Sequence, residues 1–379
     1  MKIMFIFGTR PEAIKLAPVI NELKKHEDDF HIKVCVTAQH RQMLDQVMAD
    51  FEITSDYDLN IMEPGQDLFG VTCEVLKGLK HVLNKDRPNM IIVHGDTTTS
   101  MVASLAAYYL KISIGHVEAG LRTYSKYSPF PEEINRKITG ILSDIHFAPT
   151  EIAKNNLLKE GVQEGNIFVC GNTVVDALLL MDLKINSNAG LLEKLASKFD
   201  FLDPAKRMIL VTGHRRENFG SGFENICNAL VKIAEHYPDV EILYPVHLNP
   251  NVQEPVKRIL GESKRNNIHL IPPVDYLSFV YLMKKSYFII TDSGGLQEEA
   301  PSLGKPVLVM RDTTERPESI EAGTARLVGT DENVIYSASV DLLDREISYR
   351  EMSCAKNPYG DGYTSKRIAI VLREFKNKF

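Results

Sequence analysis

Residues 288–318 read FIITDSGGLQEEAPSLGKPVLVMRDTTERPE, and this stretch carries the pattern that decides the fold. Apolar runs at 288–290 and 306–310 have the length and composition of buried strands. A glycine turn and a short helix-like segment separate them, which is the βαβ arrangement of a parallel sheet. The stretch therefore predicts an α/β domain.

The turn inside this stretch has the composition of an anion site. Ser293, Gly294 and Gly295 follow the first apolar run directly. Backbone N–H groups exposed where a glycine turn begins a helix are a common way to hold phosphate. Glu298 and Glu299 come next, and carboxylates suit sugar hydroxyls better than phosphate. The turn predicts a site for an anion that carries a sugar.

The same alternation of strands and helices runs through the whole chain and predicts two domains. A chain of 379 residues is longer than one core usually supports. We predict two Rossmann-like, doubly wound α/β domains: 1–170 together with a C-terminal crossover helix at 363–379, and 171–362. Strands are predicted at 3–7, 34–37, 90–93, 112–114, 145–148 and 167–170, and then at 208–212, 241–246, 268–271, 288–290 and 307–310.

Composition excludes several classes of function. Lys+Arg 44 against Asp+Glu 50 gives a net charge of −6, without the basic surplus that nucleic-acid binding needs. No apolar run approaches the roughly 20 residues of a membrane span. The 5 cysteines are dispersed and form no C-x-x-C pair, which fits a reducing compartment. We predict a cytoplasmic protein that binds neither nucleic acid nor membrane.

Carboxylates follow the strands of the first domain where a ligand is expected. Asp96 and Glu118 come just after neighbouring predicted strands, and ligands of doubly wound sheets bind at that edge. Glu132 opens a helix after a proline loop, a place suited to a general acid or base. His94 and His116 precede the first two carboxylates, so a metal site is the alternative. Because the helical spacing of histidine metal motifs is missing, we predict no metal.

Cations at two helix starts complement these carboxylates. Arg10 and Lys15 flank the first helix start, and His214 follows the first strand of the second domain. The first strand is not followed by G-x-G-x-x-G, which argues against a nicotinamide or flavin cofactor. The chain thus combines phosphate-binding groups with carboxylates able to transfer protons, and we predict no cofactor.

Together these motifs resemble the non-hydrolysing UDP-N-acetylglucosamine 2-epimerase family, in that family's order and over nearly the whole chain. The matching segments are GTRPEAIKLAPV, TAQHRQMLDQV, HGDTTTS, HVEAGLRT, SPFPEEINR, GNTVVDAL, TGHRRENFG and TDSGGLQEEAPSLGKPVLVMRDTTERPE with EAGT. The resemblance implies a GT-B fold, in which two Rossmann-like domains face a central nucleotide-sugar cleft, and a homodimer.

The resemblance also assigns roles to individual residues. It implies that Arg10, Lys15 and His214 meet the diphosphate, with His214 counted among the catalytic groups. Asp96, Glu118 and Glu132 match the family's acid/base carboxylates. The implied substrate-binding set on the second domain is Phe279 near uridine, Ser293, Gly294 and Gly295 at phosphate, Glu299 on the ribose hydroxyls, and Arg316.

The chain departs from the family pattern at two positions. Val274 stands where a glutamine is expected, which bears on uracil recognition if that contact is made by a side chain. Gln39, His40 and Gln42 match a region that binds a second, activating UDP-GlcNAc in some members. Gly65 replaces the arginine of those members, so allosteric activation stays open.

The implied reaction is reversible epimerisation of UDP-N-acetylglucosamine to UDP-N-acetylmannosamine, with UDP eliminated and added back through 2-acetamidoglucal. Its products would supply ManNAc-type sugars for cell-surface polysaccharide. The alternatives are a hydrolysing epimerase that releases ManNAc and UDP, a GT-B glycosyltransferase, and a non-catalytic nucleotide-sugar sensor. A glycosyltransferase would not need Asp96, Glu118 and Glu132 together, and a sensor could lose them.

Overall fold

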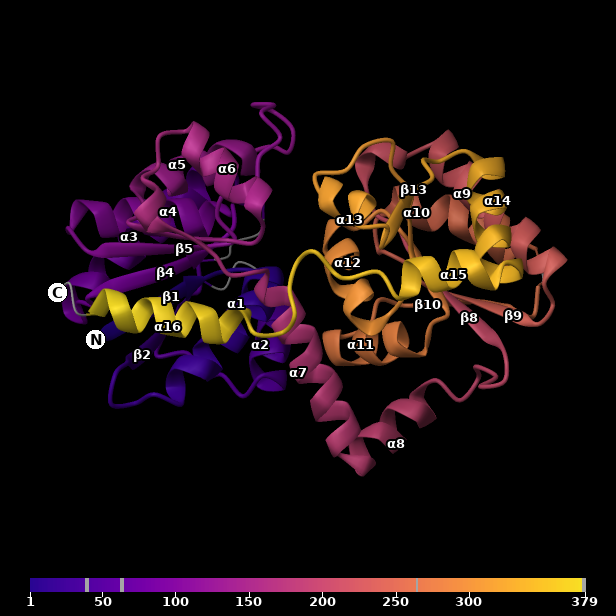
Figure 1. The fold of residues 1–379 in the computed structure, drawn as a ribbon, viewed down its shortest axis with the longest axis horizontal. Helices are drawn as coiled ribbons and strands as arrows, with labels where there is room; N and C mark the ends of the chain where they lie inside the picture. Colours follow the sequence, from indigo (N-terminus) through magenta and orange to yellow (C-terminus); the bar gives the residue numbers. More distant parts are fainter. Residues whose placement is uncertain (38–40, 62–64, 264, 377–379) are drawn as a thin grey trace. The chain divides into compact units, whose positions relative to one another are not determined.

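The computed structural model describes residues 1–37, 41–61, 65–263 and 265–376, and the chain divides into two compact units (Figure 1). Unit 1 is Met1–Ala177 with Tyr359–Phe379, and unit 2 is Leu178–Pro358. From the sequence, the chain was predicted to pass from the first unit to the second at 170/171 and to return at 362/363. In the structure the outgoing crossing falls inside a helix, and the returning crossing precedes Tyr359.

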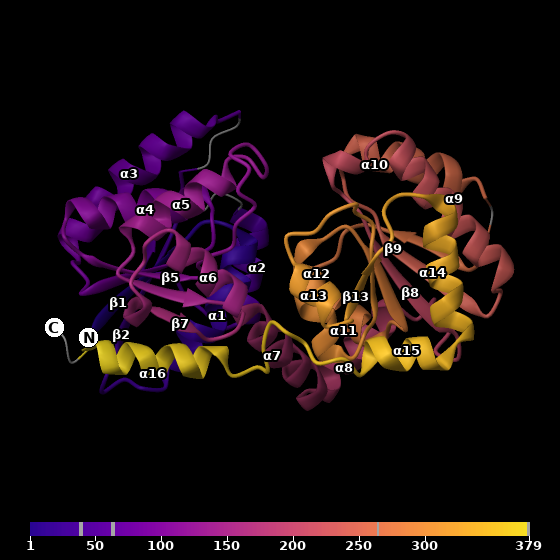
Figure 2. The same cartoon turned by 45° about the horizontal axis from the view of Figure 1, so that its top comes forward.

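Unit 1 is built on a fully parallel sheet in the order β3-β2-β1-β4-β5-β6-β7. Its strands are β1 (Lys2–Phe7), β2 (His31–Val36), β3 (Tyr57–Asp58), β4 (Met90–His94), β5 (Ser113–Val117), β6 (Ile145–Ala148) and β7 (Ile167–Val169). Its helices are α1 (Arg10–Lys24), α2 (Arg41–Asp50), α3 (Leu68–Lys85), α4 (Thr98–Tyr109), α5 (Glu132–Leu142), α6 (Glu151–Lys159), α7 (Thr173–Ser187, which continues into unit 2) and α16 (Thr364–Lys376). The central strands are continuous apolar runs because helices cover both faces of the sheet (Figure 2).

Unit 2 repeats the plan with a parallel sheet in the order β10-β9-β8-β11-β12-β13. Its strands are β8 (Arg207–Thr212), β9 (Val240–Pro245), β10 (Ile268–Ile271), β11 (Phe288–Thr291), β12 (Val307–Val309) and β13 (Ala325–Leu327). Its helices are α8 (Ala189–Lys198), α9 (Ser221–His236), α10 (Pro250–Pro255), α11 (Tyr276–Lys285), α12 (Gly294–Glu299), α13 (Pro317–Glu321), α14 (Glu332–Asp344) and α15 (Glu346–Ser353).

The predicted fold class, two doubly wound α/β domains of Rossmann-like type, is confirmed. The edge strands β3 and β13 were not predicted from the sequence, and α8 lies in a stretch that reads as polar and irregular. These are short or polar elements whose apolar period is too brief to detect. Within the described residues, no helix combines the length and the apolar character that crossing a membrane requires.

Candidate functional site

The switch point of the unit 1 sheet collects the predicted side chains of that unit. Strand order reverses between β1 and β4, which are hydrogen-bonded neighbours. Such a reversal opens a crevice at the carboxyl ends of the strands. Arg10 begins the helix after β1, Lys15 lies in the second turn of that helix, and Asp96 follows β4. Glu118 follows β5, the next strand in the sheet.

Glu118 is bound by Lys15 and Asn172 and lies close to His94. Its carboxylate forms an ion pair with Lys15 on α1, and Nδ2 of Asn172 donates to Oε2 at 2.8 Å. Nε2 of His94 lies 3.8 Å from the same oxygen. The backbone of Glu118 is left-handed, with φ of 61°, a conformation that costs a non-glycine residue about 1–3 kcal/mol. Its side chain is only 8% exposed, so its surroundings fix its direction.

Asp96, in the turn after β4, and Glu132, the first residue of α5, differ from Glu118 in their partners. Arg136 forms an ion pair with Asp96, and Asn135 donates to the Asp96 carbonyl at 3.0 Å. Among the described residues, the buried Oε2 of Glu132 has no hydrogen-bond partner. A buried carboxylate oxygen left without a donor marks either strain or a place for a ligand. Three carboxylates in three different settings are the pattern of acid/base chemistry.

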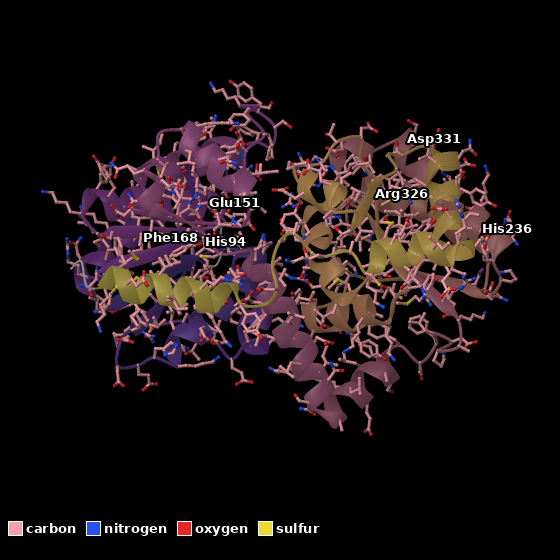
Figure 3. The ribbon with its side chains drawn as sticks, in the orientation of Figure 1. His94, Glu151, Phe168, His236, Arg326 and Asp331 are labelled. Carbon is pink, nitrogen blue, oxygen red and sulfur yellow. The ribbon has the colours of Figure 1, made fainter. Side chains whose placement is uncertain are left out.

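Three buried histidines lie on neighbouring strands of the same sheet: His94 on β4, His116 on β5 and His146 on β6. His116 is paired with His146 across the strands, and Nε2 of His116 lies 2.7 Å from the carbonyl of Gly95. Burial lowers the pKa of His94 (labelled in Figure 3) and of His146 to about 4, and that of His116 to about 3. All three rings are therefore neutral near pH 7. Within the described residues, no group of His, Cys, Asp and Glu is arranged to hold a metal ion.

These histidines predict that the protein loses stability as the pH falls below about 6.5. Between that pH and about 4 the unfolded chain binds protons that the folded chain does not, so stability falls with pH. For His146 alone the effect is on the order of 3 kcal/mol. Thermal unfolding between pH 8 and pH 5 should show a shallower pH dependence for His146→Gln than for wild type. The exposed His31→Gln is the control, and equal slopes for both variants would contradict the prediction.

Glu12 is a site residue that the sequence reasoning missed. It is buried, and its carboxylate accepts from the Gly8 N–H at 3.0 Å, from the Thr9 N–H at 2.8 Å and from the Thr97 hydroxyl at 2.6 Å. Burial outweighs these hydrogen bonds and raises the pKa of Glu12. The residue thereby ties the turn before Arg10 to the turn after Asp96. Its sequence signal was the T-x-x-E capping box at the start of α1.

Unit 2 has its own switch point, between β8 and β11, and His214 lies there. Thr212 pairs with Thr291 at the ends of these strands. The next residue after Thr291 is Asp292, which is fully buried. Its Oδ2 accepts from the N–H groups of His214 and Arg215, both at 2.8 Å, and its Oδ1 lies 3.2 Å from Nδ1 of His214. Burial on its own would raise the pKa of Asp292. The His214 side chain and the two backbone N–H groups stabilise the ionised carboxylate more strongly, so the pKa of Asp292 is lowered overall.

Asp292 therefore sets both the turn and the imidazole of His214. The side chain of His214 is 42% exposed, so the ring is accessible to a ligand. Sequence reasoning passed over Asp292 in favour of the glycines that follow it. A charged residue at the end of a buried strand was the signal.

The glycine turn after β11 is arranged around Arg316. Gly294 and Gly295 are the first residues of α12, where N–H groups have no acceptor within the helix. The N–H of Ser293 instead donates to the Thr291 hydroxyl at 2.9 Å. A Cβ on Gly294 would lie 2.6 Å from Cζ of Arg316, so only glycine allows the guanidinium to pack there.

Acidic residues on α12 hold the neighbouring groups in place. Glu298 is buried and accepts from Nε of Arg316 at 2.9 Å. Glu299 accepts from the Tyr276 hydroxyl at 2.8 Å, which fixes a carboxylate beside the glycine turn. Phe279 lies one turn further along α11 and is half-buried. The structure therefore brings together the predicted residues around the glycine turn, and it places Phe279 on the helix that carries Tyr276.

The structure does not test the predictions about allosteric activation and uracil recognition. Gln39 and His40 lie outside the described residues, and Gln42 falls on α2, where the side chain is not described. Val274 is half-buried in the loop before α11. Gly65 has φ of 75°, and no described residue lies within 4 Å of the position that a Cβ would take there. Allosteric activation and the effect of Val274 on uracil recognition therefore stay predictions.

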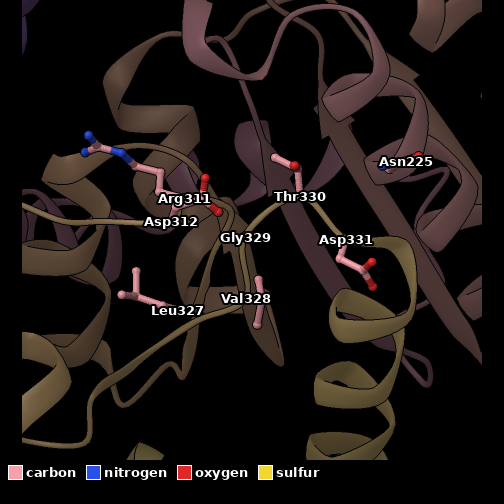
Figure 4. A pocket seen from close by; sticks show the side chains of 8 residues that line it. All are labelled: Asn225, Arg311, Asp312, Leu327, Val328, Gly329, Thr330 and Asp331. Carbon is pink, nitrogen blue, oxygen red and sulfur yellow. The ribbon is translucent and has the colours of Figure 1, made fainter.

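A hollow of about 540 Å³ lies elsewhere in unit 2, beyond the ends of β12 and β13 (Figure 4). None of the predicted site residues lines it, and its Asp312 and Asp331 are acidic. We assign it no role. Its lining residues are Asn225, Arg311, Asp312, Leu327, Val328, Gly329, Thr330 and Asp331.

Comparison with known proteins gives one consistent family. The family model described as UDP-N-acetylglucosamine 2-epimerase matches residues 21–373. The UDP-N-acetylglucosamine 2-epimerases of Yersinia pestis and Escherichia coli are 59% and 58% identical over 373 residues, or 98% of each chain. The structure of UDP-GlcNAc 2-epimerase from Neisseria meningitidis bound to UDP-GlcNAc has a TM-score of 0.93 at 51% identity and covers 99% of this chain and 100% of its own. The S. aureus MnaA structure with UDP has a TM-score of 0.87 at 48% identity, covering 100% and 97%.

Proposed function

Since this chain belongs to the UDP-N-acetylglucosamine 2-epimerase family, we propose that it interconverts UDP-N-acetylglucosamine and UDP-N-acetylmannosamine without releasing free sugar. The epimerase activity follows from the family. The non-hydrolysing course, the elimination of UDP and the residues that carry them are the proposal.

The surroundings of the unit 1 carboxylates support this proposal most directly. Glu118 is paired with Lys15 and Asp96 is paired with Arg136, whereas one buried oxygen of Glu132 has no donor in the part of the chain that the structure describes. Inverting C2 requires a proton to leave one face of the sugar and another to arrive on the opposite face. Carboxylates in unlike settings are suited to opposite halves of such an exchange.

The chemistry of the substrate explains why elimination is proposed rather than simple deprotonation. The C2–H bond of a hexosamine has no adjacent carbonyl, so a carboxylate cannot remove that proton directly at a useful rate. When the C1–O bond breaks, its electron pair leaves with UDP, and cationic character at C1 acidifies C2–H. Loss of the C2 proton then forms the C1–C2 double bond of 2-acetamidoglucal. Re-addition of UDP at C1 with a proton delivered to the other face of C2 gives the epimer.

Unit 2 is proposed to hold the nucleotide diphosphate. His214, positioned by Asp292, and Arg316, positioned by Glu298, supply donors and positive charge for the departing phosphate. Arg10 and Lys15 are proposed to add charge from unit 1. The N–H groups at the start of α12 and the carboxylate of Glu299 suit phosphate and ribose respectively. Crystallised relatives have been solved with UDP-GlcNAc or UDP bound.

The proposal also covers the use of the product, the location of the protein and its oligomeric state. The sugar product would enter cell-surface polysaccharide, the protein would act in the cytoplasm, and it would form a homodimer. A glycosyltransferase is not favoured, because acceptor transfer gives no role to three carboxylates in unit 1. The hydrolysing reaction passes through the same glycal and differs only in what becomes of it.

Proton NMR of UDP-GlcNAc incubated with the protein in D2O tests the proposal. We expect UDP-ManNAc to appear, with deuterium at C2 of both nucleotide sugars. Accumulation of free ManNAc and UDP would replace the proposal with the hydrolysing reaction. Unchanged UDP-GlcNAc without deuterium would overturn it altogether.

Gly294→Ala is expected to weaken UDP binding about tenfold. The added methyl group would displace the guanidinium of Arg316, which lies within 3 Å of its position, and one charged hydrogen bond is worth roughly 1.5–3 kcal/mol. Isothermal titration calorimetry with UDP measures the change. Gly190→Ala on α8, where a Cβ has only ordinary contacts, is the control. Equal UDP affinity in the two variants would show that Arg316 does not bind the nucleotide.

A further inference from the structure

Asn172 connects the carboxylate of Glu118 to the segment where the chain leaves unit 1. Its Nδ2 donates to Oε2 of Glu118 at 2.8 Å, and its Oδ1 accepts from the N–H of Val174 at 3.1 Å. The side chain thus uses one end as a helix cap for α7 and the other end as a donor to Glu118. Asn172 is only 2% exposed. Its amide is therefore oriented by the protein before any ligand is present.

The backbone around Asn172 is fixed by the returning chain. Its N–H donates to the carbonyl of Tyr359 at 2.6 Å, and Tyr359 is 1% exposed. One turn along α7, Asp176 accepts from the N–H groups of Thr364 at 3.2 Å and Ser365 at 2.7 Å, at the start of α16. The outgoing and returning segments are thereby joined within unit 1. A side chain mounted on this junction has little freedom to follow Glu118 if Glu118 moves.

Glu118 needs such a support because of its own backbone. With φ of 61° it occupies a conformation that its local sequence does not favour. Lys15 and Asn172 both contact Oε2, from α1 and from the start of α7 respectively. Nε2 of His94, on β4, lies 3.8 Å from the same oxygen, and this imidazole is neutral near pH 7.

We propose that Asn172 is a positioning residue of the epimerase reaction, which holds the Glu118 carboxylate in its working direction and favours its ionised form. This inference rests on the proposed role of Glu118. Sequence reasoning assigned Asn172 no part in the chemistry. An asparagine serves both purposes because one amide carries a donor and an acceptor.

Asn172→Asp separates the two uses of the side chain. An aspartate oxygen can still accept from the Val174 N–H, and the backbone bond to Tyr359 is unchanged, but the donor to Glu118 is lost. A second carboxylate beside Glu118 raises the pKa of the pair. We expect kcat to fall at least tenfold, with KM for UDP-GlcNAc and the Kd of UDP within threefold. The profile of kcat against pH should move by about one pH unit to higher pH.

Asn188→Asp is the matched control. Asn188 caps α8 through a bond from the Leu191 N–H at 3.0 Å, so the variant makes the same chemical change at a helix start away from the carboxylates. Its kcat and pH profile should equal those of wild type. If wild type is active and Asn172→Asp has the same kcat and pH profile as Asn188→Asp, the inference is overturned and the proposed function stands. A wild type without C2 exchange would instead remove the proposed function on which the inference rests.

Asn172→Ser keeps the test decisive if the aspartate variant does not fold. Serine can accept from the Val174 N–H but is too short to reach Glu118, and it adds no charge. We expect a similar loss of kcat with a smaller movement of the pH profile. A kcat within twofold of wild type for Asn172→Ser would overturn the inference.

Discussion

Replacing Glu118 with glutamine is expected to lower the rate of C2 proton exchange by about 10²- to 10⁴-fold, the contribution typical of a positioned acid or base. Glutamine keeps the shape of the side chain and can still accept from Asn172, but it cannot take up a proton and no longer pairs with Lys15. UDP affinity should stay within about threefold, because the nucleotide grip is proposed to lie mainly in unit 2. Deuterium exchange followed by NMR and calorimetry with UDP measure the two effects separately.

Glu164→Gln is the matched control for this experiment. Glu164 also pairs with a lysine, Lys154, at 2.8 Å, but its side chain is 72% exposed. That variant should exchange C2 protons at the wild-type rate. If Glu118→Gln instead loses UDP binding along with exchange, then Glu118 holds ligand rather than transferring a proton.

Replacing Asp292 with asparagine is expected to weaken UDP binding by about 10- to 100-fold. The amide oxygen can accept from the N–H groups of His214 and Arg215, but the amide nitrogen then faces Nδ1 of His214. The ring then loses the negative charge that lies 3.2 Å from Nδ1, so its proposed orientation toward the phosphate is no longer supported. Removing one member of a buried charge-assisted network commonly costs about 1.5–3 kcal/mol. Titration of the variant with UDP gives the change in Kd.

Asp331→Asn provides the comparison within the same unit. Asp331 also accepts from two backbone N–H groups, those of Asn333 at 2.9 Å and Val334 at 3.0 Å, but at the exposed start of α14. Its UDP affinity should equal that of wild type. Wild-type affinity in Asp292→Asn as well would show that Asp292 does not control the nucleotide site.

The fold could be predicted from the sequence because its central strands are buried on both faces. Runs such as residues 3–7 and 90–93 are apolar without interruption, and the structure places both at the centre of one sheet. The edge strand at Tyr57–Asp58 has two residues and no such run, so nothing in its composition distinguishes it from a loop. Helix α8 was missed because only one side of it is buried, at Leu195.

The candidate site was predictable where a residue type alone implies chemistry and was missed where the role comes from a contact. Carboxylates after strands, as at Glu118, and glycines before a helix, as at Gly294, are visible in one sequence. The parts played by Glu12, Asp292 and Asn172 are to hold those groups, and they depend on which strand ends are neighbours. Only the sheet order brings the end of β8 to the end of β11, and with it His214 to Asp292.

The central claim is that this chain breaks the bond between C1 and the UDP oxygen during epimerisation. UDP-GlcNAc labelled with ¹⁸O in that bridging position, incubated with the protein and followed by ³¹P NMR, tests it most directly. Cleavage frees the terminal phosphate of UDP to rotate, so the account predicts that ¹⁸O moves into its non-bridging oxygens while UDP-ManNAc forms. Epimerisation with the label retained entirely in the bridge would contradict the account.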